Sequence, residues 1–230
     1  MNHTKIERIR ISSLGIEYIN DNLIKIFENS RIYAHLHLSI QSWSDKILKL
    51  MNRNYDRKFL IETLEKLNSI KREDGVMISI WADIIVWFPQ ENDNDFKDTL
   101  NLIEKYNITK VHAFPFSAHE NRDFIPASKF PNQVKNHIKM ERLRMIIRKW
   151  DEVRINFLKQ NSWNKFKLLV EKVSNKWVTW LNWFSWWSEN YIFLNERNFK
   201  VESQIEIWKI VEWTFIYDAS VIEKLESQDW

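Results

Sequence analysis

The chain has 230 residues, with 34 Lys and Arg against 31 Asp and Glu, which gives a formal net charge of +3. A composition of 44% hydrophobic and 28% charged residues excludes intrinsic disorder, and the mildly basic balance permits a nucleic-acid partner. The absence of cysteine excludes disulfides, a thiol nucleophile and any cysteine-ligated zinc or iron–sulfur cluster within this chain. No apolar run is long enough to span a bilayer and the first residues do not form a signal peptide, so we expect a cytoplasmic protein with no membrane partner.

The first half of the chain alternates between strand-like and helix-like patterns. Strands are predicted at residues 8–14, 35–40, 76–86 and 110–114 from their apolar residues. Helices are predicted at residues 16–29, 45–51, 56–70 and 94–106, followed by a long basic helix at residues 134–159. Ser44 is expected to cap the helix that begins at residue 45. This order predicts an α/β fold with about four parallel strands of a barrel or sheet.

The pattern changes after residue 160. Short β-like runs follow one another at residues 166–173, 178–184, 190–194, 204–211 and 214–217. Such closely spaced strands are typical of a small all-β barrel. We therefore predict an α/β domain over residues 1–160, a small β-barrel over residues 161–218 and a tail over residues 219–230.

Glycine is unusually rare and tryptophan unusually common. The chain has 2 Gly and 13 Trp, whereas about 16 Gly are expected at the usual frequency of about 7%. Several tryptophans occupy places where a turn usually needs glycine: Trp43, Trp87, Trp177, Trp180, Trp183, Trp186 and Trp187. We hypothesise that most of these tryptophans are UGA codons that the source organism reads as glycine. The alternative is a tryptophan-rich surface that stacks on carbohydrate or nucleic-acid bases.

Four polar residues are predicted to share one face of neighbouring strands. His35 and His37 alternate on a single strand, so both imidazoles point the same way. Together with Asp83 and His112 they could bind a metal, as in metal-dependent barrel hydrolases. The alternative is that all four are polar residues filling the interior of a barrel.

Other candidate residues lie at strand ends and in the loops that follow. Gln41 and Ser42 end a strand and offer hydrogen-bonding groups to a nucleoside. Arg53 is a cation that could hold a carboxylate, or could form a surface ion pair. If Trp87 is glycine, its bare backbone would let a nucleoside lie against the strand.

The order of motifs resembles that of the radical-SAM tRNA methylthiotransferases. The matching segments are residues 8–14, 35–45, 50–55, 83–91 and 112–117, and the resemblance extends over about residues 7–217. In that family positions 43 and 87 are glycines. The Arg-Ile-Ser-Ser-Leu and His-Ala-Phe-Pro-Phe-Ser segments look most like the threonylcarbamoyladenosine branch. Residues 188–192 match a motif of the family's RNA-binding TRAM domain.

The resemblance implies the carboxyl-terminal part of a radical-SAM (β/α)6 partial barrel followed by a TRAM-like barrel. The implied reaction adds a methylthio group to carbon 2 of threonylcarbamoyladenosine beside the anticodon of tRNA. The implied cofactors are S-adenosylmethionine and 4Fe–4S clusters. The residues that carry over to an S-adenosylmethionine site are Gln41, Ser42, Arg53, Asp83 and Trp87. Those that carry over to tRNA binding are Lys165, Lys167, Ser188, Asn190 and Tyr191.

This chain departs from the family pattern in two ways. It has none of the cysteines that ligate the family's clusters, and residues 119–123 replace the family's Arg-x-Gly-Thr motif. We therefore expect part of a split, misread or truncated gene, whose cysteine-containing half a separate polypeptide could supply. The alternative is a non-catalytic RNA-binding remnant.

Overall fold

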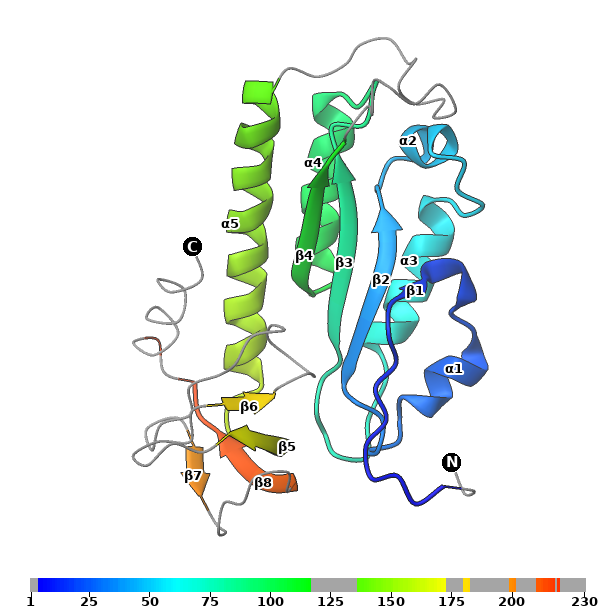
Figure 1. Ribbon diagram of the computed structural model, residues 1–230. Helices are drawn as coiled ribbons and strands as arrows, with labels where there is room; N and C mark the ends of the chain where they lie inside the picture. Colours follow the sequence, from blue (N-terminus) through cyan, green and yellow to red (C-terminus); the bar gives the residue numbers. More distant parts are fainter. Residues whose placement is uncertain are drawn as a thin grey trace.

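The first part of the protein is a parallel sheet covered by helices. The computed structural model describes residues 4–116, 136–172, 180–182, 199–201, 210–217 and 219. Its first sheet has the strand order β1-β2-β3-β4 with every neighbouring pair parallel (Figure 1). The strands are β1 (Leu14–Gly15), β2 (His35–Gln41), β3 (Ser79–Val86) and β4 (Ile108–Pro115). The helices are η1 (Ile16–Tyr18), α1 (Asp21–Ile26), α2 (Asp45–Leu50), α3 (Arg57–Asn68), α4 (Asp93–Lys105) and α5 (Asn136–Gln160).

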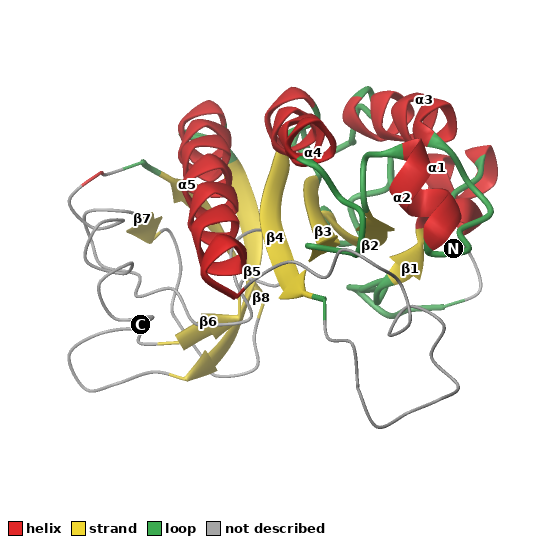
Figure 2. Cartoon of the chain, turned by 90° about the horizontal axis from the view of Figure 1, so that it is seen from above, coloured by secondary structure: helices red, strands yellow, loops and turns green. Residues whose placement is uncertain are grey.

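The helices lie on one face of this sheet, as the view along the strands in Figure 2 shows. Successive side chains of a strand point to opposite faces of the sheet, so the helices cover every second residue of each strand. Leu36, Leu38 and Ile40 of β2 are fully buried in the core cluster, as are their counterparts on β3. The intervening residues, His37 and Ser39 among them, point to the other face. The polar residues of interest therefore gather on the side without helices.

Local signals explain where the helices begin. Asp56 accepts a hydrogen bond from the amide of Phe59 and caps α3, and Asn92 and Asp95 form a capping box on α4. Ser44 precedes α2, but its side chain does not cap that helix. Its hydroxyl instead donates to Asp95, 51 residues away, at 2.7 Å. The prediction for Ser44 was wrong because a partly buried carboxylate was within reach.

The α/β prediction is confirmed for the first part of the chain, with two differences at its start. The predicted strand over residues 8–14 is reduced to β1 and an isolated bridge between Ile9 and Ile32. The predicted helix over residues 16–29 is divided into η1 and α1. Asn20 lies between them in an extended conformation and caps α1 with its side chain, which interrupts the helix.

A second, antiparallel sheet follows α5, with the strand order β6-β5-β8-β7. Its strands are β5 (Lys165–Lys172), β6 (Trp180–Asn182), β7 (Phe199–Val201) and β8 (Ile210–Phe215). The runs predicted at residues 190–194 and 204–209 lie outside the described residues. Closure into a TRAM-like barrel and the domain limits at residues 160 and 218 stay predictions. Among the described helices, none has the length and apolar character needed to cross a membrane.

Candidate functional site

The carboxyl end of β2 forms a tight, buried turn. Gln41 adopts a left-handed conformation with φ 69°, where the register between β2 and β3 also shifts. The amide of Ser42 donates to the carbonyl of Ile40 at 2.9 Å, and both Gln41 and Ser42 are buried. The hydroxyl of Tyr55 donates to the carbonyls of Ser39 and Ile40 at 3.0 and 3.1 Å. The two predicted site residues therefore stand in a backbone conformation that the fold holds in place.

The end of β3 forms a second turn with an unusual residue at its start. Trp87 has φ 63°, a left-handed conformation that favours glycine, and its side chain is 1% exposed. Its amide donates to the Glu91 carboxylate at 2.9 Å, while its indole N–H is buried without a partner. The side chain belongs to the hydrophobic core cluster. As tryptophan, this residue fills space that a glycine would leave open.

Glu91 ties this turn to the long helix α5. Its carboxylate also accepts a hydrogen bond from the guanidinium of Arg142 at 3.0 Å. Burial raises the pKa of Glu91 to about 7, although the Trp87 amide and the Arg142 cation both favour its ionised form. A second link joins the β2 turn to α4, because Lys46 contacts Asp95 at 2.5 Å and the carbonyl of Gln90 at 2.9 Å. The two strand ends are thus held together by charged groups.

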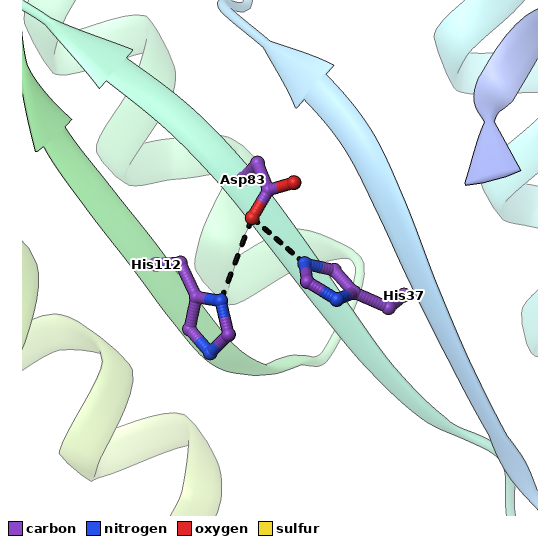
Figure 3. A group of neighbouring side chains, drawn as sticks. All are labelled: His37, Asp83 and His112. Atoms are coloured by element: carbon purple, nitrogen blue, oxygen red, sulfur yellow. Dashed lines mark hydrogen bonds and ion pairs between the residues drawn. The ribbon is translucent and has the colours of Figure 1, made fainter. Parts of the chain in front are cut away.

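A cluster of three polar side chains lies on the face of the sheet without helices (Figure 3). His37 of β2 places Nε2 2.7 Å from Oδ1 of Asp83 on β3, and His112 of β4 places Nδ1 3.5 Å from the same oxygen. Burial tends to raise the pKa of Asp83, but hydrogen bonds from His112 and His37 outweigh it and hold that pKa well below its usual range. Asp83 is therefore a carboxylate, and the imidazole N–H of His37 donates to it. We name His37, Asp83 and His112 the inner-face cluster.

The fourth predicted member, His35, is not part of the cluster. The residue is 1% exposed, neither ring nitrogen has a hydrogen-bond partner among the described residues, and burial lowers its pKa to about 3. It packs edge-on against the indole of Trp81 with the ring centroids 4.5 Å apart. Trp81 points to the same face as the cluster and also lies 5.8 Å from His112. The indole separates His35 from the other polar groups, so the prediction of a four-residue site was wrong.

Of the remaining predicted residues, Arg53 lies near the β2 turn, because its charge acts on the hydroxyl of Tyr55. Arg53 is exposed and its guanidinium makes no hydrogen bond or ion pair with any residue that the structure describes. Lys165 begins β5 and lines a groove of about 970 Å³ between the amino ends of the parallel strands and the second sheet. Lys167 lies on β5. Ser188, Asn190 and Tyr191 lie outside the described residues.

Three residues of these sites were missed in the sequence. Ser13 lies 2.8 Å from Nδ1 of His37, and Glu91 and Arg142 join the β3 turn to α5. Glu91 follows a Phe-Pro turn at the strand end, which was a usable signal. Ser13 and Arg142 carry no local signal, since each contacts its partner across more than 20 residues.

Comparison with known proteins assigns the family. Residues 2–103 match the family model of the Radical SAM superfamily. The threonylcarbamoyladenosine tRNA methylthiotransferase MtaB of Thermotoga maritima is 38% identical over 186 residues, 80% of this chain and 40% of that protein. The tRNA-2-methylthio-N(6)-dimethylallyladenosine synthase of Marinomonas sp. is 38% identical over 63% of this chain and 31% of that protein. The chain belongs to the radical-SAM tRNA methylthiotransferase family.

A solved structure supports the fold of this family member. Coproporphyrinogen III oxidase (HemN) from Escherichia coli, described as a radical SAM enzyme, superposes with a TM-score of 0.50 at 17% identity. The match covers 64% of this chain and 32% of that one, and it shows the fold alone. The chain spans about 40% of the length of the MtaB relative that it matches.

The chain offers hydrogen-bonding groups for one cofactor of the family but no ligand for the other. A 4Fe–4S cluster needs cysteine thiolates, and none of the 230 residues is cysteine, so the chain supplies no such ligand for it. A nucleoside cofactor needs hydrogen-bonding groups at the strand ends, which Gln41 and Ser42 offer from a fixed turn. Trp81 lies beside His37 on the inner face, toward the amino ends of the strands, and the Trp87 indole fills the hydrophobic core at the β3 turn.

Proposed function

We propose that this chain is the carboxyl-terminal part of an enzyme that adds a methylthio group to carbon 2 of threonylcarbamoyladenosine in tRNA. The observation that carries this proposal is the similarity to MtaB over 80% of the chain at 38% identity. Other MtaB relatives are 33–37% identical, and the one from Aquifex aeolicus is similar over 90% of the chain. The enzyme would act on tRNA in the cytoplasm.

We assign S-adenosylmethionine to the carboxyl ends of β2 and β3, where parallel α/β folds bind their ligands. Gln41 and Ser42 would hydrogen-bond the nucleoside from their buried turn. Arg53 would hold the carboxylate, and its guanidinium is exposed and free of any ion pair within the described residues. Asp83 would face the same cofactor, although its Oδ1 is already shared by His37 and His112. Position 87 would lie against the nucleoside if it is glycine.

The ligands of the family's clusters would have to lie outside these 230 residues, for example in a separate polypeptide, because none of the residues is cysteine. When bound, S-adenosylmethionine and a 4Fe–4S cluster supply the radical that this class of enzyme uses. The chain's own residues would bind and orient the cofactor and the tRNA. Residues 161–218, with Lys165, Lys167, Ser188, Asn190 and Tyr191, would form a TRAM-like unit that holds tRNA by backbone contacts.

Split complementation tests this proposal. A bacterial strain that lacks its own enzyme would receive this chain together with the amino-terminal segment of the Thermotoga maritima relative that the chain does not span. We expect the methylthiolated nucleoside to appear in digested tRNA, detected by mass spectrometry, only when both pieces are present. Parallel strains would carry this chain with glycine introduced at Trp43, Trp81 and Trp87.

Two controls make the result interpretable. The two matching halves of the relative itself should restore the modified nucleoside, which shows that a split enzyme can work in this host. If those halves restore it and neither form of this chain does, the catalytic proposal is wrong. Salt-sensitive tRNA binding that persists in the purified chain would then support the RNA-binding remnant.

A further inference from the structure

The inner-face cluster has the composition and spacing of a metal site. His37, Asp83 and His112 come from three adjacent strands, and one ligand atom from each lies within 4.8 Å of the other two. The rings of His37 and His112 are 4.9 Å apart and nearly perpendicular, so both approach the Asp83 oxygen from different sides (Figure 3). An ion about 2.1 Å from each ligand atom needs ligand atoms about 3 to 3.5 Å apart. The distance of 3.5 Å between Asp83 and His112 lies within that range, and the distance of 2.7 Å between Asp83 and His37 lies just below it.

The strand register explains why these three side chains converge. His37 is paired with Trp81 and Asp83 with His112, so Asp83 lies two residues further along the sheet than His37. All three positions point to the face of the sheet on which none of the described helices lies. Their side chains are 14 to 24% exposed, which leaves room for an ion to enter from that face.

Neighbouring hydroxyl groups hold two of the three ligands in place. Ser13 Oγ lies 2.8 Å from Nδ1 of His37, which fixes the ring and leaves Nε2 directed at the cluster. Ser39 donates to Oδ2 of Asp83 at 3.3 Å, which leaves Oδ1 for the cluster. Hydrogen bonds of this kind orient metal-ligating imidazoles and carboxylates in proteins.

We propose that His37, Asp83 and His112 bind a divalent transition-metal ion such as Zn²⁺ or Fe²⁺. Two imidazoles and one carboxylate favour these ions over Mg²⁺ and Ca²⁺, which prefer oxygen ligands. Three protein ligands leave at least one coordination position for water or for an anionic oxygen of a bound molecule. This proposal does not depend on the proposed methylthiotransferase activity, in which Asp83 would instead face S-adenosylmethionine.

Isothermal titration of the purified, metal-free chain with Zn²⁺ alone tests the proposal. We expect one Zn²⁺ per chain with a micromolar or lower Kd. His112→Ala and Asp83→Asn should weaken binding by at least about tenfold, and Ser13→Ala by about tenfold, because it only loosens the orientation of His37. His137→Ala is the matched control, since it removes an imidazole from a residue of α5 that is not one of the three ligands, and it should leave the Kd unchanged.

Folding is checked on every variant by far-UV circular dichroism and thermal melting. Asp83→Asn keeps the size and shape of the side chain and should therefore fold, so it still tests the site if His112→Ala does not fold. Visible absorption of Co²⁺ bound in place of Zn²⁺ provides a second measurement, because its spectrum reports nitrogen and oxygen ligation directly. Absence of stoichiometric binding, or binding that His137→Ala weakens as much as Asp83→Asn does, would show that the cluster is only a hydrogen-bonded group.

Discussion

The backbone N–H of Trp87 donates a 2.9 Å hydrogen bond to Glu91 from a left-handed conformation with φ 63°. A β-carbon at such a φ value costs about 1 to 2 kcal/mol. The chain therefore combines a backbone that suits glycine with the largest of all side chains. Asn52 and Asn107 also have positive φ, but asparagine tolerates that region better.

Substitution of Trp87 by two small residues measures this backbone preference. Trp87→Gly and Trp87→Ala both remove the same buried indole, so both should be less stable than the parent chain by several kcal/mol. The glycine variant should nevertheless be more stable than the alanine variant by about 1 kcal/mol, because only alanine is strained at φ 63°. Urea unfolding gives the difference. An alanine variant of equal or greater stability would show that the turn is not left-handed in solution.

The codon hypothesis is tested by the mass of one peptide from the native source organism. Tryptic cleavage releases residues 73–97, which contain both Trp81 and Trp87. We expect the mass of the peptide with glycine at both positions. That result would remove the buried Trp87 indole and leave space for a nucleoside at the β3 turn. A mass with two tryptophans would mean that the indole fills this space and would favour the RNA-binding remnant.

Glu91 should make stability depend on pH. Its pKa is about 7 in the folded protein against an ordinary 4.5, so the folded state binds this proton more tightly than the unfolded state does. The resulting stabilisation is complete below pH 4.5 and is lost as the pH rises through 7, a change of about 3 kcal/mol. Glu91→Gln cannot ionise but can still accept from the Trp87 amide. The free energy of unfolding of the parent protein, relative to that of Glu91→Gln, should therefore fall by about 3 kcal/mol as the pH rises from 4.5 through 7, and a constant difference would contradict the shift.

Tyr55 should stabilise the turn that holds Gln41 and Ser42. Its hydroxyl donates to two carbonyls at the end of β2, and the residue is 7% exposed. Tyr55→Phe should lower the free energy of unfolding by about 1 to 2 kcal/mol, because these acceptors lose a buried donor. Tyr18→Phe is the matched control at an exposed position and should change it by less than about 0.5 kcal/mol. Equal effects would show that the hydrogen bonds contribute nothing specific.

The lysines of β5 should contribute to tRNA binding by charge. The double variant Lys165→Ala with Lys167→Ala should weaken tRNA binding and reduce the salt dependence of the affinity by about one unit of slope for each phosphate that a lysine no longer neutralises. Lys58→Ala on α3 removes one charge from a different, exposed surface and is the control. Filter binding over a range of salt concentrations gives both quantities. An unchanged slope in the double variant would remove β5 from the tRNA-binding surface.

Short-range patterns predicted much of the α/β part of the molecule. The alternation in residues 35–40 gave β2 to within one residue, and the acidic run near residue 94 gave the start of α4. The break between η1 and α1 could not be predicted from periodicity, because Asn20 caps a helix in the middle of a continuous apolar pattern. The predicted inner-face residues were partly correct. His37, Asp83 and His112 meet as expected, whereas His35 is separated from them by Trp81.

The sequence by itself determined most strands and helices of the α/β part, the shared face of His35 and His37, and the family that the motifs resemble. Those properties depend on neighbours within a few positions along the chain. Only the tertiary structure decided that His37 and His112 share one oxygen of Asp83, and that Ser13 supports His37. Only the tertiary structure showed that Arg142 donates to Glu91, from which it is 51 residues apart in the chain. Such contacts depend on the register between parallel strands and on the docking of α5, which are fixed by packing across long connections rather than by any local pattern.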